Sequence, residues 1–393
     1  MSKAVRAERV PLPLALCAML FAALMNEFDF IRRLREQLST RKTSTRVVAA
    51  IGDDAAVFRQ SSDRDLVIST DLLVEGIDFH REATPPRLLG HKALAVSLSD
   101  VAAMGARPLW SLVSIGLPQS AWASDFKDEF FTGYFTLADR FGVTLTGGDI
   151  SESTQIVIDS IVVGEVSAGR AVMRSTAQPG DQIFVTGNLG GAAAGLKLIE
   201  LGARVSEPDA VAGGQNSQQE ADGRQQDVSV PGAVAIGSSL TGDDHAIQTL
   251  LLRQLCPQPR VGWGIVLGEE HLATSMIDIS DGLSSDLHHL CNESNVGAAI
   301  DAASLPLDEN VVQLCGRRAL DPLALALHGG EDFELLFTMS PENVSRLPKR
   351  VDAVSCSRIG ELTDKPCAVL IQEKNRSWNL QPQGFTHFTR RVP

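Results

Sequence analysis

The 393-residue sequence lacks several patterns that would each point to a common class of protein. Its six cysteines form no CxxC pair and no cysteine–histidine spacing typical of zinc, so a zinc site or a disulfide-dependent fold is not expected. No Walker GxxxxGK[ST] loop is present, and TGNLGGAAAGL does not match the GxGxxG dinucleotide fingerprint. A bound nucleotide would therefore have to be held through metals and scattered loops.

Positive charge is also scarce in this chain. It has 35 Lys and Arg against 48 Asp and Glu, a formal net charge of −13 at pH 7, without an evident basic patch. Nucleic acid is therefore not an expected partner. The hydrophobic fraction of 44% is ordinary for a globular enzyme, and the length exceeds one hydrophobic core. We expect a folded chain of two domains.

Apolar segments alternate with helical patterns along the chain. Strands are predicted at DLVISTD, LWSLVSIGL, IVIDSIVVGEV and QIFVTG, and helices after Pro86 up to Gly105 and from Ser124 to Phe141. This order predicts an α/β or α+β fold. The polar stretch 167–180 suggests a domain boundary, giving domains 25–166 and 167–393. Residues 203–245, rich in Gln, Asp, Gly and Ser, are expected to form a flexible insertion without catalytic residues.

One acid lies where an apolar residue would be expected. In the helix predicted after Pro86, Leu89, Val96, Asp100 and Met104 share one face. An unpaired buried carboxylate is costly, so Asp100 should meet a cation, a metal or several donors. A buried aspartate that caps a neighbouring loop is the alternative interpretation.

Further acids follow strand-like segments or neighbour glycine. Asp53 and Asp54 lie in IGDDAAV, Asp71 in ISTDLL and Asp149 in LTGGDIS. Carboxylates that converge from separate loops suit Mg²⁺, which takes oxygen ligands and can bridge phosphates. The alternative is that each acid only forms a turn, the commonest use of aspartate in such loops.

A second pair of acids lies at a predicted strand–helix junction, in TSMIDISDGLSSDLHHL. Asp278 and Asp281 flank Ser280 there and could hold a second metal while helix N–H groups approach a phosphate. The alternative is that Asp281 is a plain helix N-cap.

Taken together, these segments resemble the thiamine-monophosphate kinases, a family of the aminoimidazole ribonucleotide synthetase-like superfamily. The matching segments, in order, are IGDDAAV, STDLLVEGIDF, SLSDVAAMGARP, LTGGDIS, RSTAQPGD, VTGNLGG, PQPR, DISDGL, GGEDFEL and GFTHF. They cover the chain from about Glu27 onward, except for the insertion.

The resemblance implies an N-terminal domain whose sheet forms a homodimer, a C-terminal α/β domain, and Mg-ATP in a cleft lined by both. It also implies direct transfer of the ATP γ-phosphoryl group to thiamine monophosphate, without a protein nucleophile. At Asp78 the family commonly has His. The implied ligands of several Mg²⁺ ions are Asp54, Ser69, Thr70, Asp71, Asp100, Asp149, Asp278 and Asp281; the implied contacts are Gly148, Arg174 and Ser280 for ATP, and Asp78, Glu331 and Phe385 for thiamine monophosphate.

Two other readings stay open at this stage. One is another ATP-dependent enzyme of the superfamily, either a selenophosphate synthetase or the ring-closing purine enzyme; the other is a non-catalytic metal-binding relative. A selenophosphate synthetase would be expected to carry a reactive cysteine near the start of the fold, whereas Cys17 precedes it.

The first 24 residues raise a question of localisation. Three basic residues precede an apolar run from Leu12 to Leu24, which resembles a signal peptide but is too short to span a bilayer. The alternative is a translation start placed too early, since MNEFDFIRRL from Met25 has the pattern of an amphipathic first helix. We expect a cytoplasmic protein with no membrane partner, because a secreted enzyme would meet little ATP.

Overall fold

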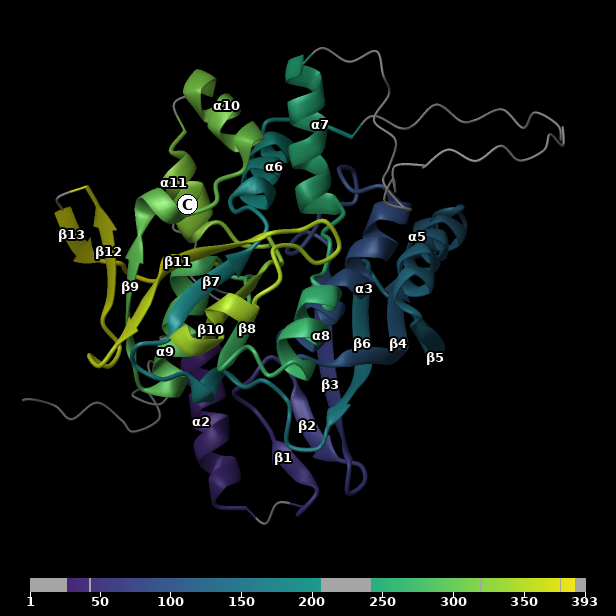
Figure 1. Cartoon of the computed structure of the whole chain (residues 1–393). Helices are drawn as coiled ribbons and strands as arrows, with labels where there is room; N and C mark the ends of the chain where they lie inside the picture. Colours follow the sequence, from purple (N-terminus) through teal and green to yellow (C-terminus); the bar gives the residue numbers. More distant parts are fainter. Residues whose placement is uncertain (1–26, 42–43, 206–241, 319, 375, 386–393) are drawn as a thin grey trace, which may run out of the picture. The chain divides into compact units, whose positions relative to one another are not determined.

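The computed structural model describes residues 27–41, 44–205, 242–318, 320–374 and 376–385 (Figure 1). Internal contacts divide the chain into two units, Met1–Ser44 with Thr386–Pro393, and Thr45–Phe385. Helix α2 (Glu27–Ser39), in the first unit, is the predicted first helix. Residues 1–24 lie outside the described residues. Across the described ranges, no helix is both long and apolar enough to cross a membrane.

The second unit contains two β-sheets. In each sheet all neighbouring strands are antiparallel except for one parallel pair. The first has six strands in the order β1-β2-β3-β6-β4-β5, with β4 and β5 parallel. Its alternating burial, clearest in β3, gives one face toward helices and one face toward solvent. The strands are β1 (Val47–Ala49), β2 (Ala56–Arg59), β3 (Arg64–Val74), β4 (Arg107–Leu117), β5 (Thr144–Glu152) and β6 (Val157–Ser167).

Helices α3 (Pro86–Ala103) and α5 (Phe126–Phe141) cover one face of this sheet (Figure 1). The short helix α4 (Gln119–Trp122) directly precedes α5 in the chain. Pro86 occupies the first position of α3, as predicted. Gly142, in the left-handed conformation with φ of 66°, ends α5 where the sequence predicts. The single apolar stripe predicted for α3 was too narrow. Almost every residue of α3 is buried, because it packs against β3 and β6, α5 and α8 (Val261–Glu269) together.

The second sheet has seven strands in the order β13-β12-β9-β11-β7-β10-β8, with β12 and β9 parallel. Its strands are β7 (Gln182–Thr186), β8 (Ser275–Asp278), β9 (Gly297–Asp301), β10 (Leu335–Met339), β11 (Cys356–Thr363), β12 (Val369–Glu373) and β13 (Arg376–Asn379). The accompanying helices are α6 (Gly191–Glu200), α7 (Gly242–Leu255), α9 (Leu283–Ser294), α10 (Glu309–Arg318) and α11 (Pro322–His328).

The two faces of the second sheet belong to two different cores. Ile183 and Val185 of β7 face a cluster that contains Leu283, Leu287 and Leu290 of α9. Phe184 and its stacked partner Phe337 instead join the core of α3, α5 and the first sheet. One apolar core therefore runs from the first sheet to the second, which fixes α3 against β8.

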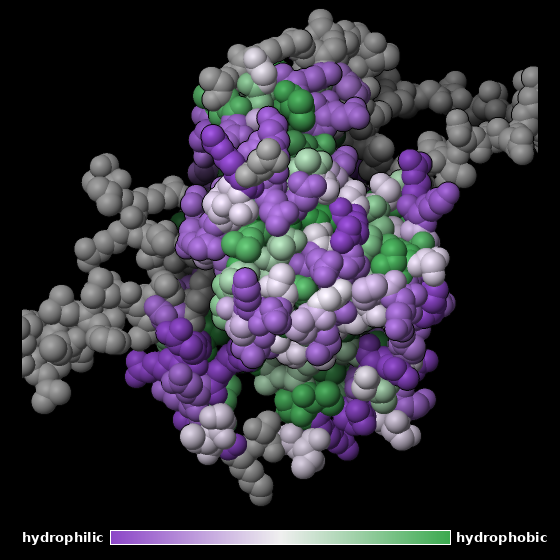
Figure 2. Space-filling model, turned by 60° about the vertical axis from the view of Figure 1, so that its left-hand side comes forward, coloured by the Kyte–Doolittle hydropathy of each residue, from purple (hydrophilic) through white to green (hydrophobic). Residues whose placement is uncertain are grey.

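The mixed α/β fold with two sheets is confirmed. Between Ser167 and Gln182 the chain forms only the short 3-10 helix η1 (Arg174–Thr176), where the sequence suggests a boundary. Of the predicted insertion, residues 206–241 lie outside the described residues. Its ends belong to the fold, because α7 begins at Gly242 and Ala203 and Val205 pack beside α6 and α7. On the face shown in Figure 2, hydrophobic side chains occupy small separate areas among hydrophilic ones.

Candidate active site

Four predicted metal-binding acids converge where α3 meets both sheets. Asp71 lies on β3, Asp100 in the last turn of α3, Asp278 at the end of β8 and Asp54 in the loop before β2. Carboxylate oxygens of Asp54, Asp100 and Asp278 all lie within 4.8 Å of one another. We call Asp54, Asp71, Asp100 and Asp278 the acid cluster. Residues more than 200 positions apart thus form one site.

Hydroxyl groups and one arginine support the acid cluster. Ser69 Oγ donates to Asp100 Oδ2, and Ser99 Oγ donates to Asp278 Oδ2 over 2.7 Å. Arg174 binds Asp54 with two N–H groups, Nη2 at 2.7 Å and Nε at 3.1 Å. Such bidentate pairs fix geometry as well as charge. Arg174 therefore places a positive charge beside the cluster.

The acids perturb one another because they are buried together. Burial, followed by the charges of Asp71 and Asp278, raises the pKa of Asp100 well above its ordinary value. Burial raises the pKa of Asp71 to about 6, and burial with the charge of Asp54 raises the pKa of Asp278 to about 8. The cluster therefore needs protons or cations to balance its negative charge.

These residues fit a divalent cation. Asp71 Oδ2 is buried and has no hydrogen-bond partner among the residues that the structure describes, an uncommon and costly state for a carboxylate oxygen. Oxygen-only donors that meet from separate elements are the set that Mg²⁺ prefers. Asp53 accepts the Arg174 backbone N–H over 2.9 Å, a contact between segments 121 positions apart, so the turn-forming alternative does not describe it.

Thr70 and Asp149, two other predicted metal ligands, lie on the face of the first sheet opposite to the acid cluster. Successive strand residues face opposite sides, so Thr70 does not share the face of Ser69 and Asp71. Thr70 Oγ1 donates to Asp159 Oδ1 over 2.6 Å, and both Asp159 and Asp149 pair with Ser114 across the sheet. Sequence analysis missed Asp159, although an acid within the apolar strand IVIDSIVV was a signal.

A second group of predicted residues surrounds the start of α9. The N-cap of α9 is Gly282, so the N-cap alternative for Asp281 was wrong. The backbone N–H of Glu331 donates to Ser280 O over 2.8 Å, and that of Phe385 donates to Asp281 O over 3.1 Å. Three distant segments thus meet, with Glu331 and Phe385 beside Ser280 and Asp281. The buried acid Asp286, which accepts the Gly282 N–H, was missed there.

The remaining predicted residues show local structural roles. Gly148 has φ of 152°, and a Cβ there would lie 1.8 Å from the Val113 carbonyl oxygen, so the β4–β5 pairing requires glycine. Asp78 Oδ2 accepts the Val74 N–H over 2.8 Å within its own loop. This contact gives Asp78 a turn-stabilising role.

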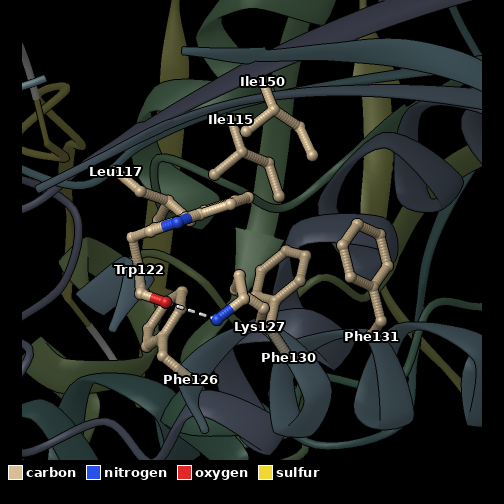
Figure 3. A pocket seen from close by; sticks show the side chains of 8 residues that line it. All are labelled: Ile115, Leu117, Trp122, Phe126, Lys127, Phe130, Phe131 and Ile150. Atoms are coloured by element: carbon tan, nitrogen blue, oxygen red, sulfur yellow. Dashed lines mark hydrogen bonds between the residues drawn. The ribbon is translucent and has the colours of Figure 1, made fainter. Parts of the chain in front are cut away.

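An apolar hollow lies on the helix-covered side of β4 and β5. In Figure 3 the side chains of Ile115 and Ile150 face those of Phe130 and Phe131, while Lys127 donates to the Trp122 carbonyl oxygen. Lys127 Nζ also lies 4.9 Å from the centre of the Trp122 ring. Ile150 lies two positions after Gly148 on β5, whereas the side chain of the intervening Asp149 lies on the other face of the sheet. Sequence analysis did not identify the hollow.

Comparison with known sequences identifies the family. Residues 52–166 match the sequence model described as AIR synthase related protein, N-terminal domain, and residues 258–371 match the corresponding C-terminal domain. The thiamine-monophosphate kinase of Escherichia coli (strain K12) is 34% identical over 369 residues, covering 92% of this chain and 98% of that protein. The chain belongs to the thiamine-monophosphate kinase family. The kinase of Bacillus subtilis (strain 168) is 31% identical over 368 residues, covering 93% of this chain and 100% of that protein.

Solved structures of the family share this fold over nearly the whole chain. One, described as AaThiL complexed with AMPPCP and TMP, has a TM-score of 0.71 and 28% identity, covering 92% of this chain and 97% of that one. The thiamine-monophosphate kinase of Stenotrophomonas maltophilia K279a has a TM-score of 0.65 and 34% identity, covering 88% and 96%. The family's two-domain α/β architecture is therefore that of this chain.

Proposed function

We propose that this chain transfers the γ-phosphoryl group of ATP to thiamine monophosphate, giving thiamine diphosphate and ADP, in thiamine diphosphate biosynthesis. Full-length similarity to kinases of this name supports the reaction over the selenophosphate synthetase and purine alternatives. The observation that carries the proposal is the acid cluster, in which Asp71 Oδ2 is buried with no partner in the described part of the chain.

We propose that Asp54, Asp71, Asp100 and Asp278 hold Mg²⁺ ions, with Ser69 and Asp281 as further ligands. Thr70 and Asp149 are proposed as ligands of a separate ion, because their side chains lie on the opposite face of the sheet. When bound, Mg²⁺ would neutralise the charges of the phosphates and so allow two anionic groups to approach each other. Ser69 and Ser99 orient the carboxylates through their hydroxyl groups. A non-catalytic metal-binding relative would not need four buried acids with oriented carboxylates at one site.

The polypeptide itself contributes positioning and fixed positive charge to the reaction. Arg174, held by Asp54, would contact ATP phosphates, and Ser280 and Gly148 would adjoin the nucleotide. We also propose the hollow of Figure 3 as the place for the nucleotide base, because aromatic and aliphatic side chains line it. The terminal phosphate of the acceptor is ionised near neutral pH, so it needs no strong general base.

The acceptor would bind beside the start of α9. Glu331 and Phe385 come together there through their backbone contacts to Ser280 and Asp281. The Phe385 side chain is 43% exposed and could stack on the cationic thiazolium ring. Asp78 would complete the contacts to thiamine monophosphate only if its loop released the bond to Val74.

We further propose a homodimer formed through the outer face of the first sheet. Leu72 and Trp110 are 59% and 42% exposed on that face, and Ile68, Leu112 and Ile161 lie between them in the strand register. Light scattering that reports a monomer at micromolar concentration would contradict this arrangement.

We also propose domain limits of 25–166 and 167–393 and a cytoplasmic location, with neither a membrane nor a nucleic-acid partner.

The experiment that tests the reaction compares two acceptors. Purified protein is incubated with Mg-ATP and either thiamine monophosphate or thiamine, and the products are separated by chromatography. We expect only the monophosphate to react, because the hydroxyl of thiamine would need a base and would leave the metal charge unmatched. Conversion of thiamine as fast as its monophosphate would refute the mechanism.

A further inference from the structure

Side chains from distant parts of the chain hold the backbone of Arg174 on both sides. Its N–H group donates to Asp53 Oδ1 over 2.9 Å. Its carbonyl oxygen accepts two hydroxyl groups, from Ser275 Oγ over 3.0 Å and from Ser294 Oγ over 2.5 Å. Because these side chains lie 101 to 121 positions away, they fix Arg174 against other elements and do not form a local turn.

The two hydroxyl groups connect Arg174 to elements that carry other parts of the site. Ser275 is the first residue of β8, which ends at Asp278. Ser294 is the last residue of α9, and its Oγ also accepts the Ala177 N–H over 3.1 Å. The short helix η1 is therefore held against β8 and α9 together, which fixes its place relative to the acid cluster.

Two adjacent aspartates hold different parts of Arg174. Asp53 accepts its backbone N–H, whereas Asp54 accepts two N–H groups of its guanidinium. Asp54 is also a proposed Mg²⁺ ligand, and a carboxylate that binds a cation has fewer lone pairs left for an arginine. The bonds to the Arg174 backbone do not use the acid cluster, so metal binding does not compete with them.

Resting on the proposed function, we propose that Asp53 and Ser294 are positioning residues, which keep the Arg174 guanidinium where it binds the phosphates of ATP. A long arginine side chain can adopt many rotamers, so a fixed backbone limits where its charge can lie. Position is important here, because a misplacement of about 1 Å can lower a rate by about 100-fold. This role gives Asp53 a function that requires no contact with metal.

The test measures ATP binding separately from turnover. Calorimetry with a non-hydrolysable ATP analogue and saturating Mg²⁺ gives its Kd, and steady-state assays give KM for thiamine monophosphate. In Asp53→Ala the Kd should rise about tenfold, because the Arg174 N–H loses its acceptor, while KM for thiamine monophosphate stays within about twofold. Asp53→Asn keeps an acceptor oxygen and should recover most of the affinity, with the same Mg²⁺ requirement as wild type.

Ser294 provides a second test, which also decides the question if Asp53→Ala does not fold. Ser294→Ala removes only the hydroxyl group and should raise the Kd for the ATP analogue about threefold. Ser294→Thr keeps a hydroxyl group and should restore the wild-type Kd. A Kd that stays at the wild-type value in Ser294→Ala would contradict the role of Ser294.

A double-mutant cycle distinguishes positioning from a general effect on the fold. In an Arg174→Ala background, Asp53→Ala should change the Kd by less than about twofold, because the arginine that it positions is absent. The matched control is Asp301→Ala. Asp301 Oδ1 accepts the Ala303 N–H over 3.0 Å at the 3-10 helix η2 (Ala302–Ser304), a contact of the same kind that does not involve Arg174. This variant should keep the wild-type Kd.

The outcomes separate this inference from the proposed function. If wild-type protein does not phosphorylate thiamine monophosphate, the proposed function fails. If wild-type protein is active and Asp53→Ala keeps its Kd for the ATP analogue, the positioning assignment fails alone. A full tenfold effect of Asp53→Ala in the Arg174→Ala background would also overturn it, as would a raised Mg²⁺ requirement in Asp53→Asn, which would identify Asp53 as a metal ligand.

Discussion

Asp100 shows how one residue can combine a packing cost with a binding role. It lies near the end of an otherwise buried helix, within reach of Asp54 and Asp278, and accepts the Ser69 hydroxyl. Its raised pKa shows that the folded chain opposes its negative charge unless a cation is present. The helix has therefore kept an acid where an apolar residue would stabilise it more.

Substitutions at single acids test the metal assignment. Asp100→Asn and Asp281→Asn should each lower kcat by about 100-fold or more while the protein stays folded, because each removes anionic charge from a metal site. Steady-state assays at saturating Mg²⁺ measure the effect. Asp63→Asn, at an exposed acid bonded to Ser61, is the control and should behave as wild type. Full activity of both site variants would exclude the assignment.

At the scale of elements, the two ends of the predicted insertion matter more for the stability of the fold than the length of the segment between them. The Arg204 carbonyl oxygen accepts from Gln248 of α7, so the two ends lie against each other in the described structure. Ala203 and Val205 pack beside α6 and α7. A short linker can therefore join residues 205 and 242 without displacing either helix.

Deleting residues 206–241 and joining the ends with a short Gly-Ser linker should leave kcat and KM close to wild type. Loop length has only a weak effect on stability when its ends are already held together. Deleting residues 203–245 is the comparison, and it should lower the melting temperature because it removes Val205 and the start of α7. Insoluble or inactive protein from the shorter deletion would show that the segment is structural.

For the whole molecule, the acid cluster makes stability depend on pH and on Mg²⁺. The pKa of Asp278 is about 8 in the folded chain against an ordinary value of 3.8, so the folded state binds an extra proton between these values. This contribution to stability is complete below about pH 4 and is lost as pH rises through 8. Metal ligands must be deprotonated, so Mg²⁺ binding competes with that proton.

Thermal unfolding from about pH 6.5 to 8.5 checks this expectation. Metal-free protein should lose melting temperature over that range, and added Mg²⁺ should stabilise it more at pH 8.5 than at pH 6.5. Starting at pH 6.5 avoids the opposite contribution of His91 and His289, whose pKa values are lowered to about 4. Asp278→Asn should reduce both effects; an unchanged pH slope in that variant would contradict the role of Asp278.

The sequence by itself determined the fold class, many of the elements between α2 and α9, and most of the acids, whereas the elements from β9 to β13 were not predicted. Alternation of apolar residues, Pro86 and Gly142 are local signals, so strands such as β3 and the limits of α3 and α5 followed from them. Asp54, Asp71, Asp100 and Asp278 were identifiable because acids at strand ends or in apolar stripes conflict with local burial.

Only the tertiary structure decided which of these residues share a site. Thr70 and Asp71 are adjacent in sequence but lie on opposite sheet faces, because strand side chains alternate. Lys92, Gln254 and Glu331 meet from three segments spread over 239 positions, and no local pattern sets a lysine opposite a glutamate across a core. Contacts of this kind depend on how helices pack on the two sheets, which is decided by the complete core and not by any one segment.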